Sequence, residues 1–188
     1  MSKLFFISDH HFGHENVYKF RDRLTDERIR PWAKDATEGD RMLIQLWNST
    51  VKPKDTVYHL GDFCMNIKRI EIAKQLNGRK ILIRGNHDHG NVQTYLEYFE
   101  EVFGVLYKYG MVLSHFPIHP GSLNFRQKVN LHGHTHSYSV LKTVRGKEVI
   151  DPRYVNVSVE SEVHHWLSIH PGTPITLEQI NAYLTRDQ

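Results

Sequence analysis

Five short runs of apolar and β-branched residues recur along the chain, and each run ends at a polar motif. The runs cover residues 4–7, 56–60, 80–83, 111–113 and 129–131. Short runs that stop at Gly or Asp are typical of buried strands. The motifs that follow them are Asp9-His10-His11, Gly61-Asp62, Gly85-Asn86-His87-Asp88, Ser114-His115 and Gly133-His134-Thr135-His136. Because open α/β sheets bind ligands beyond the carboxyl ends of their strands, we expect these motifs to share one site.

Helical spacing fills several intervals between these runs. Apolar residues three and four positions apart, such as Leu43 and Trp47, predict a helix with one buried face. Thr176 and Gln179 have the spacing of a capping box, which predicts the start of a last helix. Helices are expected over residues 38–51, 67–76 and 92–99, and after residue 176. Further extended segments are expected over 102–107, 140–144, 148–150 and 154–159.

The polar motifs gather residue types that bind metal ions. Two Asp, one Asn and three or four His converge at the predicted strand ends. Carboxylate and amide oxygens mixed with imidazole favour Mn, Fe, Zn, Co or Ni over Ca or Mg. The set contains enough donors for two ions.

Composition narrows the class of protein only a little. A chain of 188 residues without an interdomain linker predicts one domain over residues 1–188. The single Cys64 excludes an intramolecular disulfide, and no apolar stretch approaches the ~20 residues of a membrane span. The chain opens Met-Ser-Lys without the apolar core of a signal peptide, so we expect a cytoplasmic protein. The net charge of +3, without a run of five Lys or Arg, does not by itself indicate a nucleic-acid partner.

The order of the motifs resembles the calcineurin-like metallophosphoesterase family from residue 9 to residue 136. The pattern is Asp-x-His, Gly-Asp, Gly-Asn-His-Asp, His and Gly-His-x-His. The surrounding residues 8–16, 60–63, 115–117 and 156–160 are similar to short phosphoesterases of bacteria and their phages. The resemblance implies an α/β fold, a four-layered α/β/β/α sandwich in a single domain.

The resemblance also implies two groups of metal ligands joined by one carboxylate. The first ion would be held by Asp9, His11 and His136, and the second by Asn86, His115 and His134, with Asp62 as the bridge. The expected cofactors are two divalent transition-metal ions, with Mn first and Fe, Zn, Co or Ni as alternatives. Such a pair lowers the pKa of a bridging water and clamps the phosphoryl oxygens.

Four further residues are expected to take part in catalysis or substrate binding. His87 follows the ligand Asn86 and is expected to protonate the leaving group as a general acid. Asp88 is expected to orient the His87 imidazole. His14 and Asn16 are candidates for substrate binding, although a capped turn leading into residues 17–20 explains them equally well.

The remaining histidines are expected to be structural. His10, His59 and His132 are interpreted as packed or hydrogen-bonded residues near the strands. His164, His165 and His170 lie beyond the motifs and are expected on the surface.

These features together predict a dinuclear metal-dependent phosphohydrolase acting on a small phosphate ester or nucleotide. Phosphodiesterase activity is the leading hypothesis because a small chain without a cap domain leaves the metal centre open to varied esters. A metal-bridging hydroxide would attack phosphorus, and His87 would protonate the leaving group. Gly61-Asp62 is followed by Phe63-Cys64-Met65, which departs from the Asp-Arg-Gly continuation of the protein Ser/Thr phosphatase branch.

Two alternatives stay open at this point. A nuclease acting on single-stranded nucleic acid would need a basic, aromatic channel, for which the candidates are Arg21, Arg23, Arg28, Arg30 and Trp32. From another class, the chain could be a metal-binding scaffold with little turnover. The sequence does not fix the oligomeric state.

Overall fold

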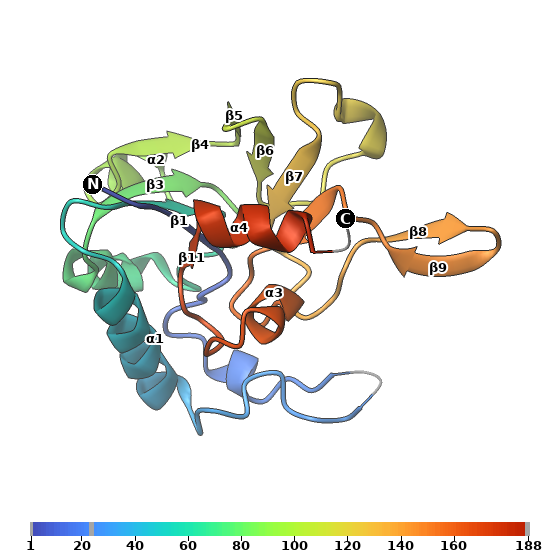
Figure 1. The fold of residues 1–188 in the computed structure, drawn as a ribbon. Coiled ribbons are helices and arrows are strands. Elements are labelled where there is room, and N and C mark those ends of the chain that lie inside the picture. The colour runs from blue at the N-terminus through green and yellow to red at the C-terminus, as the bar shows by residue number, and fades with distance from the viewer. Residues whose placement is uncertain (1, 23–24, 187–188) are drawn as a thin grey trace.

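Two β-sheets organise the chain, with the order β11-β1-β2-β3-β4 in the first sheet and β10-β7-β6-β5 in the second (Figure 1). The computed structural model describes residues 2–22 and 25–186. The first sheet contains β1 Leu4–Ile7, β2 Thr56–His59, β3 Arg79–Ile83, β4 Glu101–Phe103 and β11 Ile175–Thr176. The second contains β5 Val105–Lys108, β6 Met111–Ser114, β7 Val129–His132 and β10 Tyr154–Asn156. The mixed α/β fold expected from the sequence is confirmed.

The strands that carry the motifs lie in the parallel part of each sheet, while β11 and β5 at the edges pair in antiparallel with β1 and β6. β1, β2, β3 and β4 pair in parallel in the first sheet, and β6, β7 and β10 do so in the second. The five predicted strands are therefore confirmed as β1, β2, β3, β6 and β7. Within each parallel set the carboxyl ends of the strands meet at one edge of the sheet.

Two extended segments predicted as single strands connect the sheets. The segment 102–107 divides at Gly104, so that β4 belongs to the first sheet and β5 to the second. In the segment 154–159 only β10 joins the second sheet. Its continuation forms an isolated parallel bridge between Ser158 and Ser8, with the Ser8 amide donating to the Val157 carbonyl at 3.0 Å. The ends of β1 and β10 are thereby held together.

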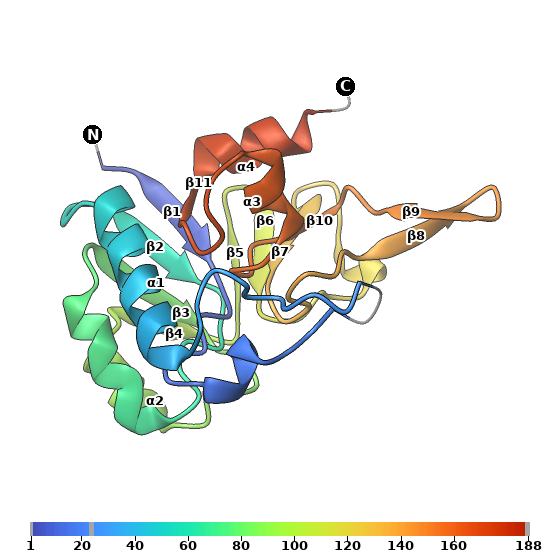
Figure 2. The same cartoon turned by 90° about the horizontal axis from the view of Figure 1, so that it is seen from below.

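Helices flank the sheets (Figure 2). The longest is α1, Ala36–Thr50, which begins at Asp35, where the side chain accepts a hydrogen bond from the Glu38 amide. The others are α2 Val92–Leu96, α3 Glu162–Trp166 and α4 Leu177–Leu184, with 3₁₀ helices η1 Glu15–Tyr18, η2 Ile67–Gln75 and η3 Pro120–Ser122. The capping box of Thr176 and Gln179 is confirmed at the start of α4. Among the described residues, no helix has the length and apolar character needed to cross a membrane.

The segment predicted as an α-helix over 67–76 is a 3₁₀ helix. Its apolar side chains Ile70, Ala73 and Leu76 are buried at a spacing of three residues. A 3₁₀ helix has three residues per turn and lines up such positions, whereas an α-helix rotates them apart. The predicted helix over 92–99 is also shorter than expected and ends at Leu96.

The core divides at the first sheet because successive residues of a strand point to opposite faces. Phe5 packs with α1 residues such as Trp47 on one face of β1. The neighbouring Phe6 packs on the other face with residues of β6 and β7, including Leu113 and Leu131. Helices α3 and α4 contribute Val163 and Ile180 to this second cluster. The sandwich of two sheets is therefore held by apolar burial on both faces of β1.

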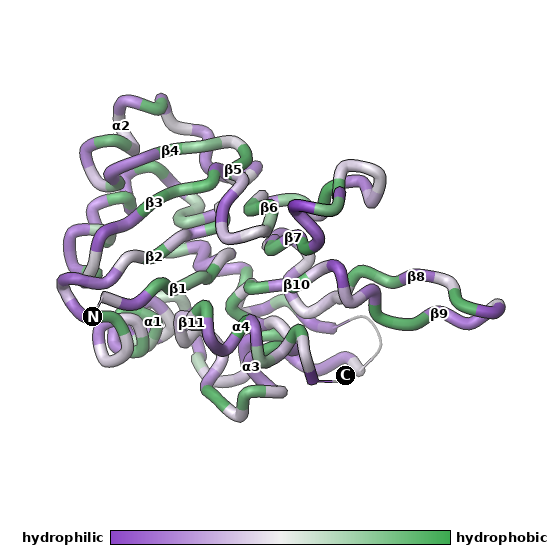
Figure 3. Tube along the Cα trace, turned by 45° about the horizontal axis from the view of Figure 1, so that its top comes forward, coloured by the Kyte–Doolittle hydropathy of each residue, from purple (hydrophilic) through white to green (hydrophobic). Residues whose placement is uncertain are grey.

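A hairpin of β8 (Leu141–Val144) and β9 (Lys147–Ile150) projects from this body (Figure 3). It matches the hairpin predicted around Arg145 and Gly146, both of which have positive φ values. The two strands pair only with each other among the described residues, and most of their side chains are exposed.

His164 is buried, which corrects its expected place on the surface. Only 1% of its area is exposed. One ring nitrogen lies 3.0 Å from the Ser161 hydroxyl, and the other lies 2.9 Å from the Thr173 carbonyl. Ser161 and Thr173 lie in short irregular segments on either side of α3, so no hydrophobic periodicity in the sequence predicts that His164 is buried. His165 and His170 are exposed as expected, and His10, His59 and His132 are buried as expected.

We predict that His164 makes the protein less stable in mild acid. Burial lowers the pKa of its imidazole to about 4, whereas a histidine in the unfolded chain titrates near ~6.5. Between these values the unfolded chain binds the extra proton. The free energy of unfolding therefore falls as the pH falls, by about 2 kcal/mol per such histidine between about pH 7 and pH 5.

The test compares urea unfolding of metal-free protein across this pH range. His164→Gln should flatten the pH dependence of the free energy of unfolding relative to the wild type. His165→Gln, which changes the exposed neighbour, should not. Identical slopes for His164→Gln and the wild type would contradict the assignment.

Candidate metal centre

The expected site residues come from five loops at the carboxyl ends of parallel strands. Asp9 and His11 follow β1, Asp62 follows β2, and Asn86 follows β3. His115 directly follows β6, and His134 and His136 follow β7. The fold brings all seven into one region because the bridge between β1 and β10 aligns these edges of the two sheets.

A first group consists of Asp9, His11 and His136. Each offers one ligand atom, and these atoms lie within 4.8 Å of one another. The Asp9 Oδ1 and both ring nitrogens of His11 are buried without a hydrogen-bond partner among the described residues. Unpaired buried polar atoms cost free energy, and a bound cation would remove that cost. The donors present here therefore fit a metal ion.

A second group consists of Asp9, Asp62 and His115, again within 4.8 Å of one another. The Oδ2 atom of Asp62 lies 3.4 Å from Nε2 of His115 and 3.6 Å from Nε2 of His11. One carboxylate oxygen is therefore placed between imidazoles of the two groups. This position suits the bridging role that the family resemblance implies.

Asn86 and His134 complete the side of the site that carries His115. The Asn86 Oδ1 lies 2.9 Å from His115 Nε2, and the His134 ring centroid lies 5.2 Å from that of His115. Asn86 and His134 are exposed, whereas Asp9, His11, Asp62 and His115 are buried. The metal centre is thus buried on one side and open to solvent on the other.

Hydrogen bonds fix which nitrogen of two imidazoles faces the site. The Nδ1 of His115 donates to the Leu60 carbonyl at 2.8 Å. The Nδ1 of His136 donates to the Glu160 carboxylate at 3.2 Å. In both residues Nδ1 is occupied by this hydrogen bond, so Nε2 is the nitrogen that would bind a metal, in place of any proton it carries.

Five of the expected ligands adopt the left-handed backbone conformation. The φ angles are 60° for Asp9, 52° for His11, 55° for Asp62, 68° for His134 and 53° for His136. Such conformations cost ~1–3 kcal/mol each in residues other than glycine, and they concentrate at functional sites. Five of the nine such residues in the described chain therefore belong to this one site.

Two motif glycines allow this close packing. A Cβ at Gly133 would lie 2.0 Å from Ser8 Oγ and 2.3 Å from Asp9 Oδ2. A Cβ at Gly85 would lie 2.2 Å from Asp62 Oδ1. Both positions therefore require glycine because the neighbouring ligand carboxylates approach the backbone directly.

Asp88 does not contact the His87 imidazole, which corrects its expected role. Its buried carboxylate accepts hydrogen bonds from the backbone amides of Asp62 and Gly85 at 2.8 Å and of Phe63 at 3.1 Å. Asp88 therefore holds the loop after β3 against the loop after β2. It holds the backbone of Asp62 rather than the His87 ring.

His87 lies at the open side of the site. Its amide donates to Asp62 Oδ1 at 2.8 Å, and its Nε2 lies 4.0 Å from Asp62 Oδ2. The side chain is 34% exposed, and its ring centroid is 5.3 Å from that of His11. The imidazole therefore reaches both the metal ligands and solvent.

His14 and Asn16 lie beside the site in the turn that begins η1. His14 is the residue that caps η1, and its Nδ1 accepts from the Val17 amide at 3.0 Å. Its ring also lies 5.7 Å from that of His11, so the capped turn forms the rim of the metal centre. Asn16 is exposed, and its described contacts are made by its backbone carbonyl to Lys19 and Phe20.

A buried ion pair behind the first group was missed by sequence reasoning. Arg30 binds Glu160, and its guanidinium also donates to the backbone carbonyls of Asp9 at 2.6 Å and His10 at 2.8 Å. Arg30 has no exposed area, so it cannot line the nucleic-acid channel considered for it. Residues 156–160 are part of the sequence that resembles the family, but no feature of the sequence around Glu160 predicts its contact with His136.

The Arg30–Glu160 pair shifts the pKa values of the ionisable groups around the first ligand group. Burial alone would lower the pKa of His136, but the adjoining Glu160 carboxylate outweighs burial and raises it to about 9. Burial also opposes ionisation of Glu160, yet the Arg30 guanidinium keeps the pKa of that carboxyl well below its usual range. For His11 burial prevails and lowers the pKa to about 4. His11 is therefore neutral at physiological pH and competent as a ligand.

Comparison with known proteins agrees with the geometry. The family model described as calcineurin-like phosphoesterase matches residues 2–183. The chain belongs to the calcineurin-like phosphoesterase family. Membership makes it a metal-dependent phosphoesterase.

Relatives of this phosphoesterase occur in archaea and phages. An uncharacterized protein of Methanocaldococcus jannaschii is 32% identical over 186 residues, which cover 96% of this chain and 90% of the relative. The gene 66 protein of Mycobacterium phage L5 is 32% identical over 176 residues, covering 75% and 81%. A crystal structure of a protein of unknown function from Aquifex aeolicus superposes with a TM-score of 0.63 at 27% identity, covering 96% of this chain and 98% of that one.

We predict that Glu160→Gln weakens metal binding at the first group. A neutral amide fixes the His136 tautomer less firmly and lowers its basicity, which typically costs ~10–100-fold in metal affinity. Arg30 would also lose its counter-charge, so the free energy of unfolding should fall by about 3 kcal/mol. Titration against a competing chelator measures the affinity, and urea unfolding measures the stability.

Glu148→Gln is the matched control, because Glu148 is exposed on the β8–β9 hairpin. It should change neither quantity. Full metal affinity in Glu160→Gln would contradict the positioning role of Glu160.

Proposed function

We propose that this phosphoesterase is a dinuclear metal-dependent phosphodiesterase that acts on small phosphate esters. The observation that carries the proposal is the position of Asp62 Oδ2, which lies 3.6 Å from His11 Nε2 and 3.4 Å from His115 Nε2. A carboxylate oxygen between two sets of imidazole and carboxylate donors is suited to holding two ions at a short separation.

In the proposal Asp9, His11 and His136 hold one ion, Asn86, His115 and His134 hold the other, and Asp62 contacts both. The cluster of Asp9, His11 and His136 supports the first set, and the contacts of His115 with Asn86 and His134 support the second. Imidazole nitrogen mixed with carboxylate and amide oxygen favours a transition metal, and Mn is our first choice. When bound, two divalent ions supply an activated water and polarise the phosphoryl oxygens.

His87 acts as the general acid in this proposal. Its imidazole lies at the open side of the centre, where a substrate oxygen can approach it. The Asp62 carboxylate holds the His87 amide, so the ring is anchored to the same residue that joins the two ligand groups. The protonated imidazole donates its proton to the departing ester oxygen as the phosphorus–oxygen bond breaks.

A diester fits the shape of the site. His87, His134 and His136 are all partly or largely open to solvent, so phosphorus can carry two organic groups without burying either completely. Two residues considered for the nucleic-acid channel of a nuclease are engaged inside the protein. Arg30 is buried, and Trp32 packs edge-on against Tyr18. Arg23 lies outside the described residues. The metal-binding scaffold reading has no observation in its favour.

We predict that the metal-replete protein contains two transition-metal ions and that Asp62→Asn abolishes turnover. A neutral amide bridges poorly and leaves the two ions without their shared anionic ligand. Elemental analysis and a chromogenic phosphodiester assay measure the two outcomes. Asp26→Asn, at an exposed aspartate, should retain both metals and activity. One ion or none in the wild type, or normal activity in Asp62→Asn, would contradict the dinuclear proposal.

We predict that His87→Ala retains both metals and loses ~10²–10⁴-fold in rate, the usual contribution of a general acid. The loss should be larger for an alkyl leaving group than for p-nitrophenolate, which departs with little protonation. His89→Ala is the control, because His89 is exposed on the same loop and its ring lies 6.1 Å from that of His87. Equal losses on both leaving groups would make His87 a phosphate-binding residue, and loss of metal would make it a ligand.

A further inference from the structure

A cavity of about 500 Å³ opens directly beside the metal centre. Two expected metal ligands, His134 and His136, form part of its wall. The rest of the wall includes Phe20 and Ile29 from the segment between β1 and α1, and Tyr138 after β7. A substituent on a phosphorus at the metal centre can therefore extend into this cavity without crossing solvent.

The cavity presents aromatic rings to solvent. Phe20 is 48% exposed and Tyr138 is 44% exposed. The Phe20 ring packs edge-on against His14 at 5.8 Å, and His14 in turn packs against His11 at 5.7 Å. The aromatic wall is therefore continuous with the first ligand group and is fixed in place relative to the reacting centre.

We propose that this cavity binds the base of a nucleotide ester whose phosphate reacts at the metal centre. Phe20 and Tyr138 are the stacking residues, and Ile29 adds apolar area. Every nucleobase has a flat π-face that stacks on aromatic side chains. Pockets of about 300–1,000 Å³ suit ligands of this size. This substrate class rests on the proposed phosphodiesterase function.

A guanidinium lies at the edge of the cavity. Arg21 lines the cavity, and its guanidinium donates to the Asp26 carbonyl and lies 3.5 Å from the Asp26 carboxylate, so it is held there in an exposed ion pair. A guanidinium stacks on bases and attracts anionic phosphate. An alkyl substituent would use the apolar area but neither the flat rings nor the cation, so we favour the base over an alkyl chain.

The test uses three diesters with the same p-nitrophenolate leaving group. Their second substituents are thymidine through its 5′ oxygen, hexyl and ethyl. For the Mn-loaded wild type we expect the highest kcat/KM with the thymidine ester. Phe20→Ala should lower the ratio of thymidine to ethyl kcat/KM about 10-fold, the size of one lost base–aromatic stack. Phe20→Leu should lower it similarly, because leucine keeps apolar area but has no ring.

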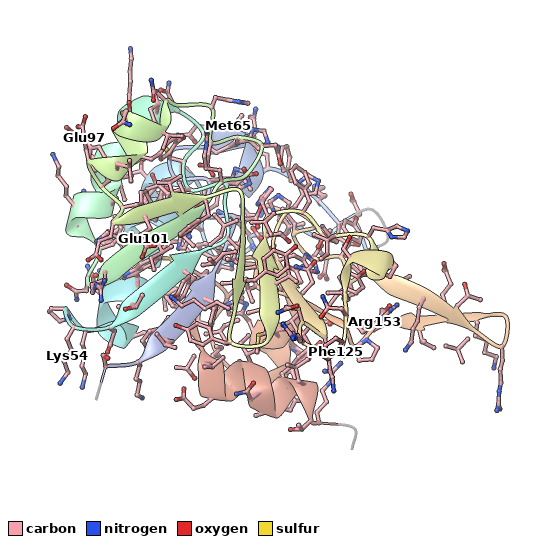
Figure 4. All side chains as sticks on the ribbon, turned by 90° about the horizontal axis from the view of Figure 1, so that it is seen from above. Lys54, Met65, Glu97, Glu101, Phe125 and Arg153 are labelled. Atoms are coloured by element: carbon pink, nitrogen blue, oxygen red, sulfur yellow. The ribbon has the colours of Figure 1, made fainter. Side chains whose placement is uncertain are left out.

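Phe125→Ala is the matched control. Phe125, labelled in Figure 4, is 78% exposed and is not one of the residues that line the cavity. It should leave the ratio unchanged. An unchanged ratio in Phe20→Ala, or a preference for the hexyl ester that Phe20→Leu retains, would overturn the proposal.

A separate binding measurement distinguishes failure of the cavity from failure of the proposed function. If the wild type hydrolyses none of the three diesters, the phosphodiesterase proposal fails. Equilibrium dialysis with adenosine 5′-monophosphate then decides the cavity. Binding by the wild type that weakens about 10-fold in Phe20→Ala supports the base site, and no binding by the wild type overturns it.

Discussion

The site depends on a buried ion pair between Arg30 and Glu160. Neither residue has appreciable exposed area, so each charge is costly unless the other is present. The guanidinium also bonds the carbonyls of Asp9 and His10, while the carboxylate accepts from His136. The pair thus joins the loop after β1, the segment before α1 and the loop after β10. Removing either partner would leave an unpaired buried charge directly behind Asp9 and His136 of the first ligand group.

Asp9 connects the Arg30–Glu160 pair to the metal centre, because its carbonyl binds Arg30 and its carboxylate belongs to the candidate ligands. Its Oδ2 accepts hydrogen bonds from the His134 amide and the Ser158 hydroxyl, both at 2.9 Å, so it joins the two sheets. Its Oδ1 is left without a hydrogen bond among the described residues, and Asp9 belongs to both groups of candidate ligands. The left-handed backbone at Asp9 is tolerated because Arg30 holds its carbonyl and the Gly61 carbonyl holds its amide. The ligand geometry therefore exists only when the two sheets are docked.

The sequence predicted the parts of this architecture that are encoded locally. The strands β1, β2, β3, β6 and β7 follow from short apolar runs, and the ligand motifs follow from their places at the strand ends. Arg30 could not be recognised, because it lies in a polar irregular segment and its partner is 130 positions away in the chain. The division at Gly104 was missed for a related reason, since both halves are extended and only the pairing partners differ. The role of Asp88 was misassigned because sequence adjacency to His87 says nothing of the backbone amides it binds.

The candidate metal centre is buried on one side and exposed on the other, and the two sides serve different purposes. Asp9, His11, Asp62 and His115 are buried, and the first three also have the strained left-handed backbone conformation. Asn86 and His134 are exposed, as is a third of His87. The candidate centre is therefore open to solvent at His87 and His134, and the aromatic cavity adjoins it at His134 and His136. Burial on one side preserves the ligand geometry, and exposure on the other leaves room for an organic group on the phosphate.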